Sequence, residues 1–190
     1  NANIYTVDST FSKVSAMAID KGKIIETGSS EQITQKYQSE QTLSLKGKTI
    51  LPGLIDDQVH FRDPGFNQKG TIHSESKAAV AGGITSFMDM PNTMPNAIDL
   101  KTLEEKYKLA ERTSLANYSF FMGINKNNLD EALQIDNTLI CGLSDDGLYF
   151  DDEEGILANY PDYLEKLFSR TDSLVALHCE DDSIDRKSVV

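Results

Sequence analysis

The sequence predicts an α/β fold: about the first five strands of a TIM-like (β/α)8 barrel, preceded by a small β-domain. Three observations predict it. Short strand-like runs separated by turn residues fill the first fifty residues. Five apolar strand-like runs then alternate with helical stripes, which is typical of a parallel sheet. Polar and ionisable residues follow the ends of these strands, where the active sites of barrels lie.

The N-terminal segment is expected to contain four short strands and one helix. The strands are predicted at 4–7, 14–19, 23–25 and 42–45. Residues 29–31 (Ser-Ser-Glu) are predicted to cap a short helix that ends near Tyr37. Pro52 and Gly53 interrupt the chain, so we place a domain over residues 1–52 and the barrel segment over 53–190.

The barrel segment repeats a strand and a helix. Strands are predicted at 54–60, 84–90, 116–123, 139–144 and 174–178. Helices are predicted at 72–80, 100–110, 127–133 and from Pro161 onward, with Asp99 capping the second. An open doubly wound sheet is the alternative, but its glycine-rich phosphate loop is absent from the sequence. A complete barrel takes about 250 residues, so this chain holds about five of the eight units.

Composition and charge exclude several function classes. Lysine and arginine number 18 against 30 aspartates and glutamates, and the net charge of −12 argues against nucleic-acid binding. No apolar run approaches the roughly 20 residues of a membrane span, and no secretory signal is visible. Two cysteines, Cys141 and Cys179, are too few for a disulfide framework, so a cytoplasmic protein is expected. The chain begins at Asn1 rather than Met, which leaves room for an upstream segment.

Three residues at predicted strand ends suggest a metal site. His60 and His178 each end an apolar strand, and Asp146 follows a third. Two imidazoles and a carboxylate suit a zinc-like cation. The alternatives are hydrogen-bonded structural histidines and an ordinary Asp-Gly turn at Asp146. His73 lies on a predicted helix, and we expect a structural role for it.

Two further residues suggest recognition of an anionic substrate. Arg62 follows His60 by two residues, and its guanidinium could hold a carboxylate through two hydrogen bonds. Asn92 lies between Pro91 and Pro95, which restrict the backbone on both sides of it. A surface salt bridge for Arg62 and a plain turn at Asn92 are the alternatives.

Four segments, in order, resemble motifs of dihydroorotases in the amidohydrolase superfamily. They are residues 52–65 (PGLIDDQVHFRDPG), 75–83 with 90–93 (MPNT), 144–147 (SDDG) and 178–181 (HCED). The third resembles the Thr-Asp-Asp-Gly of a subgroup that has aspartate in place of a carboxylated lysine. The first fifty residues are similar to the small β-domain of the superfamily, which implies half of a composite β-sandwich.

The resemblance implies a metal-dependent hydrolase that uses one or two zinc ions. Its reaction would be the reversible interconversion of dihydroorotate and N-carbamoyl-aspartate in pyrimidine biosynthesis. His60, Asp146 and His178 would be zinc ligands, with Asp146 catalytic in the bridging position. Arg62 and Asn92 would hold the free carboxylate of the small-molecule substrate.

The chain departs from the family pattern in two ways. Gln58 stands where the family usually has another histidine ligand, and strand periodicity places it on the same face as His60. An amide is a poor zinc ligand, so we expect one well-held metal and a second that is loose or missing. The family's sixth-strand histidine and eighth-strand acid lie beyond these 190 residues, so little turnover is expected from them alone.

Three alternatives stay open. Allantoinases and hydantoinases share the fold and the metals, although Arg62 and Asn92 favour a substrate with a carboxylate. A non-catalytic amidohydrolase-like subunit, or a truncated inactive fragment, would fit the two departures. Neither a nucleic acid nor a membrane is expected as a partner, and self-association into a homo-oligomer is left open.

Overall fold

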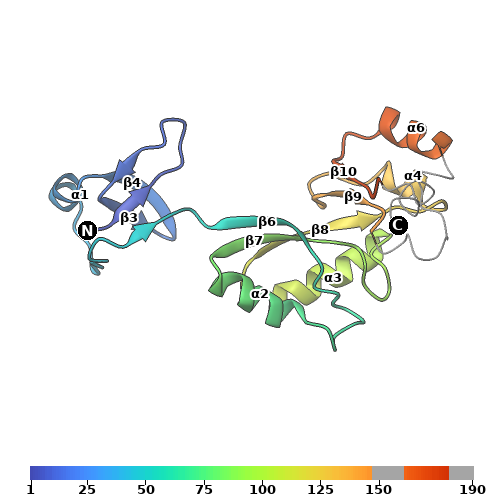
Figure 1. Ribbon diagram of the computed structural model, residues 1–190, viewed down its shortest axis with the longest axis horizontal. Coiled ribbons are helices and arrows are strands. Elements are labelled where there is room, and N and C mark those ends of the chain that lie inside the picture. Colours follow the sequence, from blue (N-terminus) through green and yellow to red (C-terminus); the bar gives the residue numbers. More distant parts are fainter. Residues whose placement is uncertain (147–160, 180–190) are drawn as a thin grey trace, which may run out of the picture. The chain divides into compact units, whose positions relative to one another are not determined.

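The computed structural model describes residues 1–146 and 161–179. The chain divides into two compact units, Asn1–Gly53 and Leu54–Val190 (Figure 1). Gly147 and the residues after Cys179, which belong to two of the sequence motifs, lie outside the described residues. No helix in the described ranges is long and apolar enough to cross a membrane.

The first unit contains two small sheets and one helix. The strands are β1 (Asn3–Tyr5), β2 (Lys13–Val14), β3 (Ala16–Asp20), β4 (Lys23–Gly28) and β5 (Thr49–Ile50). One sheet has the order β2-β1-β5, and β3 and β4 form an antiparallel pair. Helix α1 (Ser30–Lys36) begins after Ser29, whose hydroxyl accepts a hydrogen bond from the Gln32 N–H. The predicted cap is therefore confirmed.

The predicted strand at 42–45 is wrong, because the structure places the strand at Thr49–Ile50. Residues 41–45 have no regular structure, and Leu43 is 71% exposed. Lys46 and Gly47 then adopt positive φ values of 49° and 78° and turn the chain. The amide of Asn3 donates to the Gly47 carbonyl at 2.7 Å, and Asn3 pairs with Thr49. Alternating apolar residues do not form a strand where no partner strand lies beside them.

The second unit is built on a five-stranded parallel sheet. Its strands are β6 (Leu54–Val59), β7 (Ile84–Asp89), β8 (Asn117–Gly123), β9 (Gly142–Ser144) and β10 (Val175–Ala176). They pair in the order β10-β9-β8-β7-β6, and every neighbouring pair is parallel. Spatial order therefore follows chain order without reversal, as in a barrel and unlike a doubly wound sheet. The predicted partial barrel is confirmed, with its last two strands shorter than expected.

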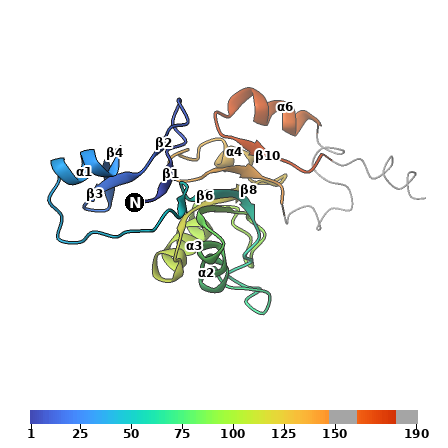
Figure 2. The same cartoon turned by 60° about the vertical axis from the view of Figure 1, so that its left-hand side comes forward.

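The described helices of this unit are α2 (Ile72–Ala81), α3 (Leu100–Thr113), α4 (Leu129–Ala132) and α6 (Pro161–Arg170). Figures 1 and 2 show α2 and α3 side by side on one face of strands β6 to β8. Most of the core between them is apolar and includes Phe87, Phe120, Leu103 and Ala110. Burying one side chain of this kind stabilises the fold by about 1.5–3 kcal/mol.

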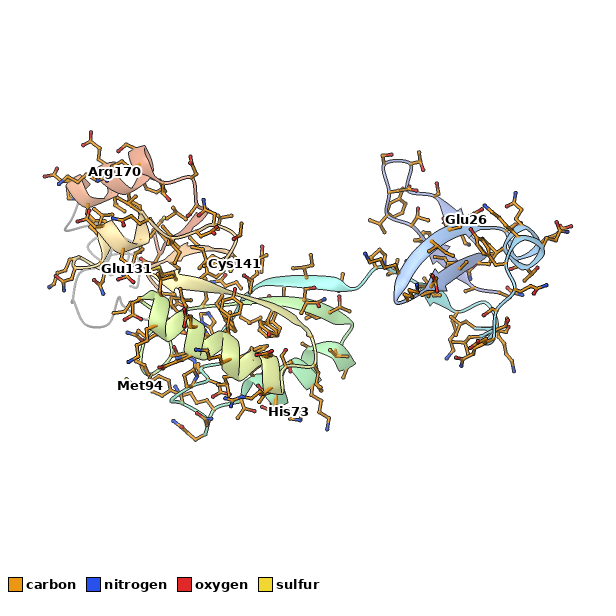
Figure 3. All side chains as sticks on the ribbon, turned by 180° about the vertical axis from the view of Figure 1, so that it is seen from behind. Glu26, His73, Met94, Glu131, Cys141 and Arg170 are labelled. Carbon is orange, nitrogen blue, oxygen red and sulfur yellow. The ribbon has the colours of Figure 1, made fainter. Side chains whose placement is uncertain are left out.

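Local contacts fix the ends of these helices. Asp99 accepts a hydrogen bond from the Thr102 N–H at 2.7 Å, so the predicted cap of α3 is confirmed. His73, labelled on α2 in Figure 3, lies 3.1 Å from the Thr113 carbonyl through Nδ1. This histidine joins the start of α2 to the end of α3, which is a structural role.

Candidate active site at the strand ends

Side chains from three strand ends meet around one carboxylate. His60 follows β6, Asp146 follows β9 and His178 follows β10. His60 Nδ1 lies 3.0 Å from Asp146 Oδ2, and His178 Nε2 lies 4.0 Å from Asp146 Oδ1. In a flat sheet β6 and β10, which are the outermost strands, would be about 19 Å apart at about 4.8 Å per strand. The sheet therefore curves strongly enough to bring both histidines to Asp146.

Asn92 contacts the same imidazole. Its Nδ2 lies 2.8 Å from His60 Nδ1, so the amide donates and the ring nitrogen accepts. Asn92 is 6% exposed, and within residues 1–146 and 161–179 its buried Oδ1 has no hydrogen-bond partner. The loop after β7 thus holds Asn92 beside His60.

The geometry around His60 suits a cation site. Among the described residues, Asp146 Oδ2 is a buried acceptor without a hydrogen-bond partner, although it lies 3.0 Å from His60 Nδ1. That nitrogen accepts from Asn92, so two acceptors face each other, which is unfavourable unless a proton or metal ion lies near them. Ligands of one zinc ion, with bonds of about 2.0–2.2 Å, lie at comparable separations.

No group of three or more His, Cys, Asp or Glu side chains within residues 1–146 and 161–179 has the geometry of a complete metal site. The described residues therefore supply part of a ligand set: two imidazoles and one carboxylate, of types that zinc prefers. Asp146 faces each histidine with a different oxygen, as a bridging carboxylate would.

Asp145 holds the second histidine. Its carboxylate is 1% exposed and accepts hydrogen bonds from the His178 backbone N–H at 3.1 Å and from ring Nδ1 at 2.9 Å. A histidine whose Nδ1–H is bound in this way presents Nε2 as a metal ligand. The sequence did not predict this contact between Asp145 and His178.

The loops after β6 and β7 lock together next to the site. The Met94 N–H donates to the Pro64 carbonyl at 3.0 Å. Gly65 has a φ of 101°, and a Cβ there would lie 2.3 Å from the Met94 Cβ. A glycine is therefore required at this contact.

Arg62 begins the first of these loops. It is half-buried and adopts a positive φ of 61°. Within the described parts of the chain, its guanidinium makes no ion pair or hydrogen bond. Its donors are thus available to an anion.

Gln58 is an exposed residue of β6. The pairing of β6 with β7 is irregular between Asp56 and Val59, where β6 carries one more residue than its partner. This irregularity interrupts the two-residue alternation from which a shared face with His60 was expected. The relation of Gln58 to a metal stays a prediction.

A buried ion pair lies behind the site. Asp89, at the end of β7, and Lys106, on α3, are 0% and 1% exposed, with Oδ2 and Nζ 2.7 Å apart. Burial raises the pKa of Asp89 and lowers the pKa of Lys106, and each charge partly offsets the effect on the other. Sequence analysis missed both residues, although Lys106 lies on the same helical stripe as Leu103 and Ala110.

A family model described as dihydro-orotase-like matches residues 47–190. The chain belongs to the dihydro-orotase-like family. It is 32% identical to the dihydroorotase of Carboxydothermus hydrogenoformans, covering 100% of this chain and 43% of that protein. It is also 32% identical to the dihydroorotase of Thermococcus kodakarensis, covering 87% of this chain and 37% of that protein. The chain thus spans about two fifths of the length of these dihydroorotases.

The fold of this dihydro-orotase-like chain also matches a solved structure. It aligns with L-hydantoinase (dihydropyrimidinase) from Arthrobacter aurescens with a TM-score of 0.76 and 20% identity, over 98% of this chain and 41% of that one. This similarity shows a shared fold. Members of the dihydro-orotase-like family are generally metal-dependent, in agreement with the ligand types gathered around Asp146.

Proposed function

We propose that the protein containing this chain interconverts dihydroorotate and N-carbamoyl-aspartate, with zinc, in pyrimidine biosynthesis. The observation that carries the proposal is the Asp146 carboxylate between His60 and His178 at the strand ends. Asn92 beside His60 adds a group for substrate recognition. The dihydroorotases that match the chain support this substrate over hydantoin or allantoin.

His60, Asp146 and His178 would hold the one or two zinc ions. Zinc bound there would polarise the amide carbonyl and lower the pKa of a bound water. Asp146 suits the bridging position because each of its oxygens faces a different imidazole. Asp145 keeps the His178 ring in one orientation by accepting its Nδ1–H.

Arg62 and Asn92 would orient the substrate. The Arg62 fork matches a carboxylate, with which it can form two parallel hydrogen bonds. Without metal the Asn92 amide donates to the His60 ring nitrogen, and with zinc on that nitrogen both amide hydrogens would be available to the substrate. Its buried Oδ1 would accept an N–H of the cyclic amide, because no residue in the described part of the chain donates to that oxygen.

The test uses the full-length protein and two ring substrates that differ only in the carboxylate, dihydroorotate and dihydrouracil. Arg62→Lys removes the planar guanidinium group, and with it the two parallel hydrogen bonds, but keeps the positive charge. Loss of a charge-assisted hydrogen bond of about 1.5–3 kcal/mol should raise KM for dihydroorotate by about 10- to 150-fold. Arg112→Lys, on the exposed surface of α3, is the matched control and should leave KM unchanged.

Two outcomes would contradict the proposal. Faster hydrolysis of hydantoin or allantoin than of dihydroorotate would assign the protein to a related activity. Zinc bound without hydrolysis of any of these compounds would indicate a non-catalytic member of the family.

A further inference from the structure

The buried ion pair between Asp89 and Lys106 lies in the layer between the sheet and α3. Both side chains are fully enclosed, and the Lys106 Nζ lies 4.6 Å from the centre of the Phe120 ring. A buried ion pair contributes little net stability, since apolar residues of similar volume stabilise a core as well or better. Its presence therefore calls for a role other than packing.

Each partner also binds the backbone next to a site residue. Asp89 Oδ1 accepts a hydrogen bond at 2.9 Å from the N–H of Phe61, the residue after His60. Lys106 Nζ donates at 2.8 Å to the carbonyl of Met90, two residues before Asn92. The pair thus connects α3 to both strand ends that carry the His60–Asn92 contact.

The backbone of His60 is fixed on both sides. The Val59 carbonyl before it accepts from the Met90 N–H at 3.0 Å, and the Phe61 N–H after it donates to Asp89. Lys106 supplies the positive charge that pairs with the enclosed Asp89 carboxylate, with Nζ and Oδ2 2.7 Å apart. Loss of Lys106 would therefore disturb Asp89, and through it the position of His60.

We propose that Asp89 and Lys106 are positioning residues that hold His60 and Asn92 in contact and direct His60 toward Asp146. The importance of this position of His60 for metal binding rests on the proposed function. The position of His60 itself can be measured without metal or substrate.

The test compares Lys106→Met with Leu103→Ala in the full-length, metal-free protein. Lys106→Met keeps most of the aliphatic stem and removes the ammonium group. Leu103 is also buried on α3, one turn earlier, so its replacement destabilises the same helix without touching Asp89. NMR of the His60 imidazole and the Asn92 side-chain amide reports their contact, with signals assigned from His60→Gln and Asn92→Ala.

Leu103→Ala should keep the wild-type signals of both groups. Lys106→Met should shift the His60 ring nitrogens toward those of a free imidazole and expose the Asn92 amide to faster hydrogen exchange. Unchanged signals in Lys106→Met, or equal changes in both variants, would overturn the proposal. Should Lys106→Met fail to fold, Asp89→Asn/Lys106→Met leaves no buried charge and is compared with Leu103→Ala in the same way.

Zinc affinity, measured by chelator competition, separates this inference from the proposed function. Lys106→Met should weaken zinc binding about 10- to 100-fold, as loss of outer-shell support does at metal sites, and Leu103→Ala should not. A wild-type protein that binds no zinc would contradict the proposed function, while the NMR comparison would still decide the positioning role.

Discussion

The carboxylate of Asp145 binds His178 at two points, the backbone N–H at 3.1 Å and the ring Nδ1 at 2.9 Å. One buried side chain thus fixes both the start of the loop after β10 and the rotation of the ring. Because Nδ1–H donates to Asp145, Nε2 is the nitrogen that faces Asp146.

Asp145→Asn should therefore weaken zinc binding in the full-length protein about 10- to 100-fold, as loss of a carboxylate partner does for other histidine ligands. Chelator competition measures the change. Asp136→Asn is the control, because Asp136 is an exposed aspartate that accepts the Thr138 N–H at 2.8 Å away from the site. Equal zinc affinity in wild type and Asp145→Asn would show that the contact only stabilises the loop.

Gln58→His should raise the zinc content of the full-length protein, because an imidazole supplies a better ligand than an amide. The wild type is expected to hold one zinc tightly and a second loosely or not at all. Metal analysis after dialysis measures the stoichiometry, and Gln35→His on exposed α1 controls for adventitious binding. Two tightly held zinc ions in the wild type, unchanged by the substitution, would contradict this expectation.

Gly65→Ala should destabilise the second unit more than Gly83→Ala. Both glycines have positive φ, but a Cβ at Gly83 meets nothing within 4 Å, whereas one at Gly65 overlaps Met94. In Gly83→Ala, backbone strain should lower the free energy of unfolding by about 1–2 kcal/mol. In Gly65→Ala, overpacking against Met94 should lower it by about 1–3 kcal/mol more. Urea denaturation gives the two free energies of unfolding, and equal losses would disprove the close contact between the loops.

Cys141 should resist alkylation until strongly alkaline pH. Burial raises the pKa of its thiol from 9.0 to about 11. The unfolded chain releases this proton at lower pH than the folded chain, so the free energy of unfolding should fall between pH 9 and about 11. Cys141→Ser should reduce this pH-dependent decrease in the free energy of unfolding. The rate of iodoacetamide labelling should rise with a midpoint at pH about 11. A labelling midpoint near 9 would contradict the burial of the thiol.

Signals that are local in the sequence predicted most of the fold. The caps at Ser29 and Asp99 each depend on a side chain three residues away, and both are present. The alternation of strands and helices was enough to predict the parallel order of five strands. The apolar alternation at 42–45 led to a wrong strand prediction, because a strand also needs a partner strand beside it. The turn at Lys46 and Gly47 comes first, and the chain pairs with Asn3 only at Thr49.

The candidate site was predicted in its residue types but not in its contacts. Strand ends indicated His60, Asp146 and His178, since parallel strands all end at one edge of the sheet. The Asn92–His60 contact joins the segments that follow β6 and β7, whose register is irregular, and no sequence period predicts it. Lys106 was missed because a lysine on an apolar stripe is normally exposed, and only the folded position of Asp89 makes its burial favourable.

The consecutive order of the strands determines the order in which the parts of the candidate site are synthesised. His60 and His178 are 118 residues apart in the chain, which at about 5–20 residues per second means about 6–24 s of synthesis between them. A metal ion that needs both histidines could therefore bind only after the second of them has been synthesised. Asp89 and Lys106, only 17 residues apart, are available to each other almost at once. The nascent chain can thus fix the strand ends that carry His60 and Asn92 before His178 has been translated.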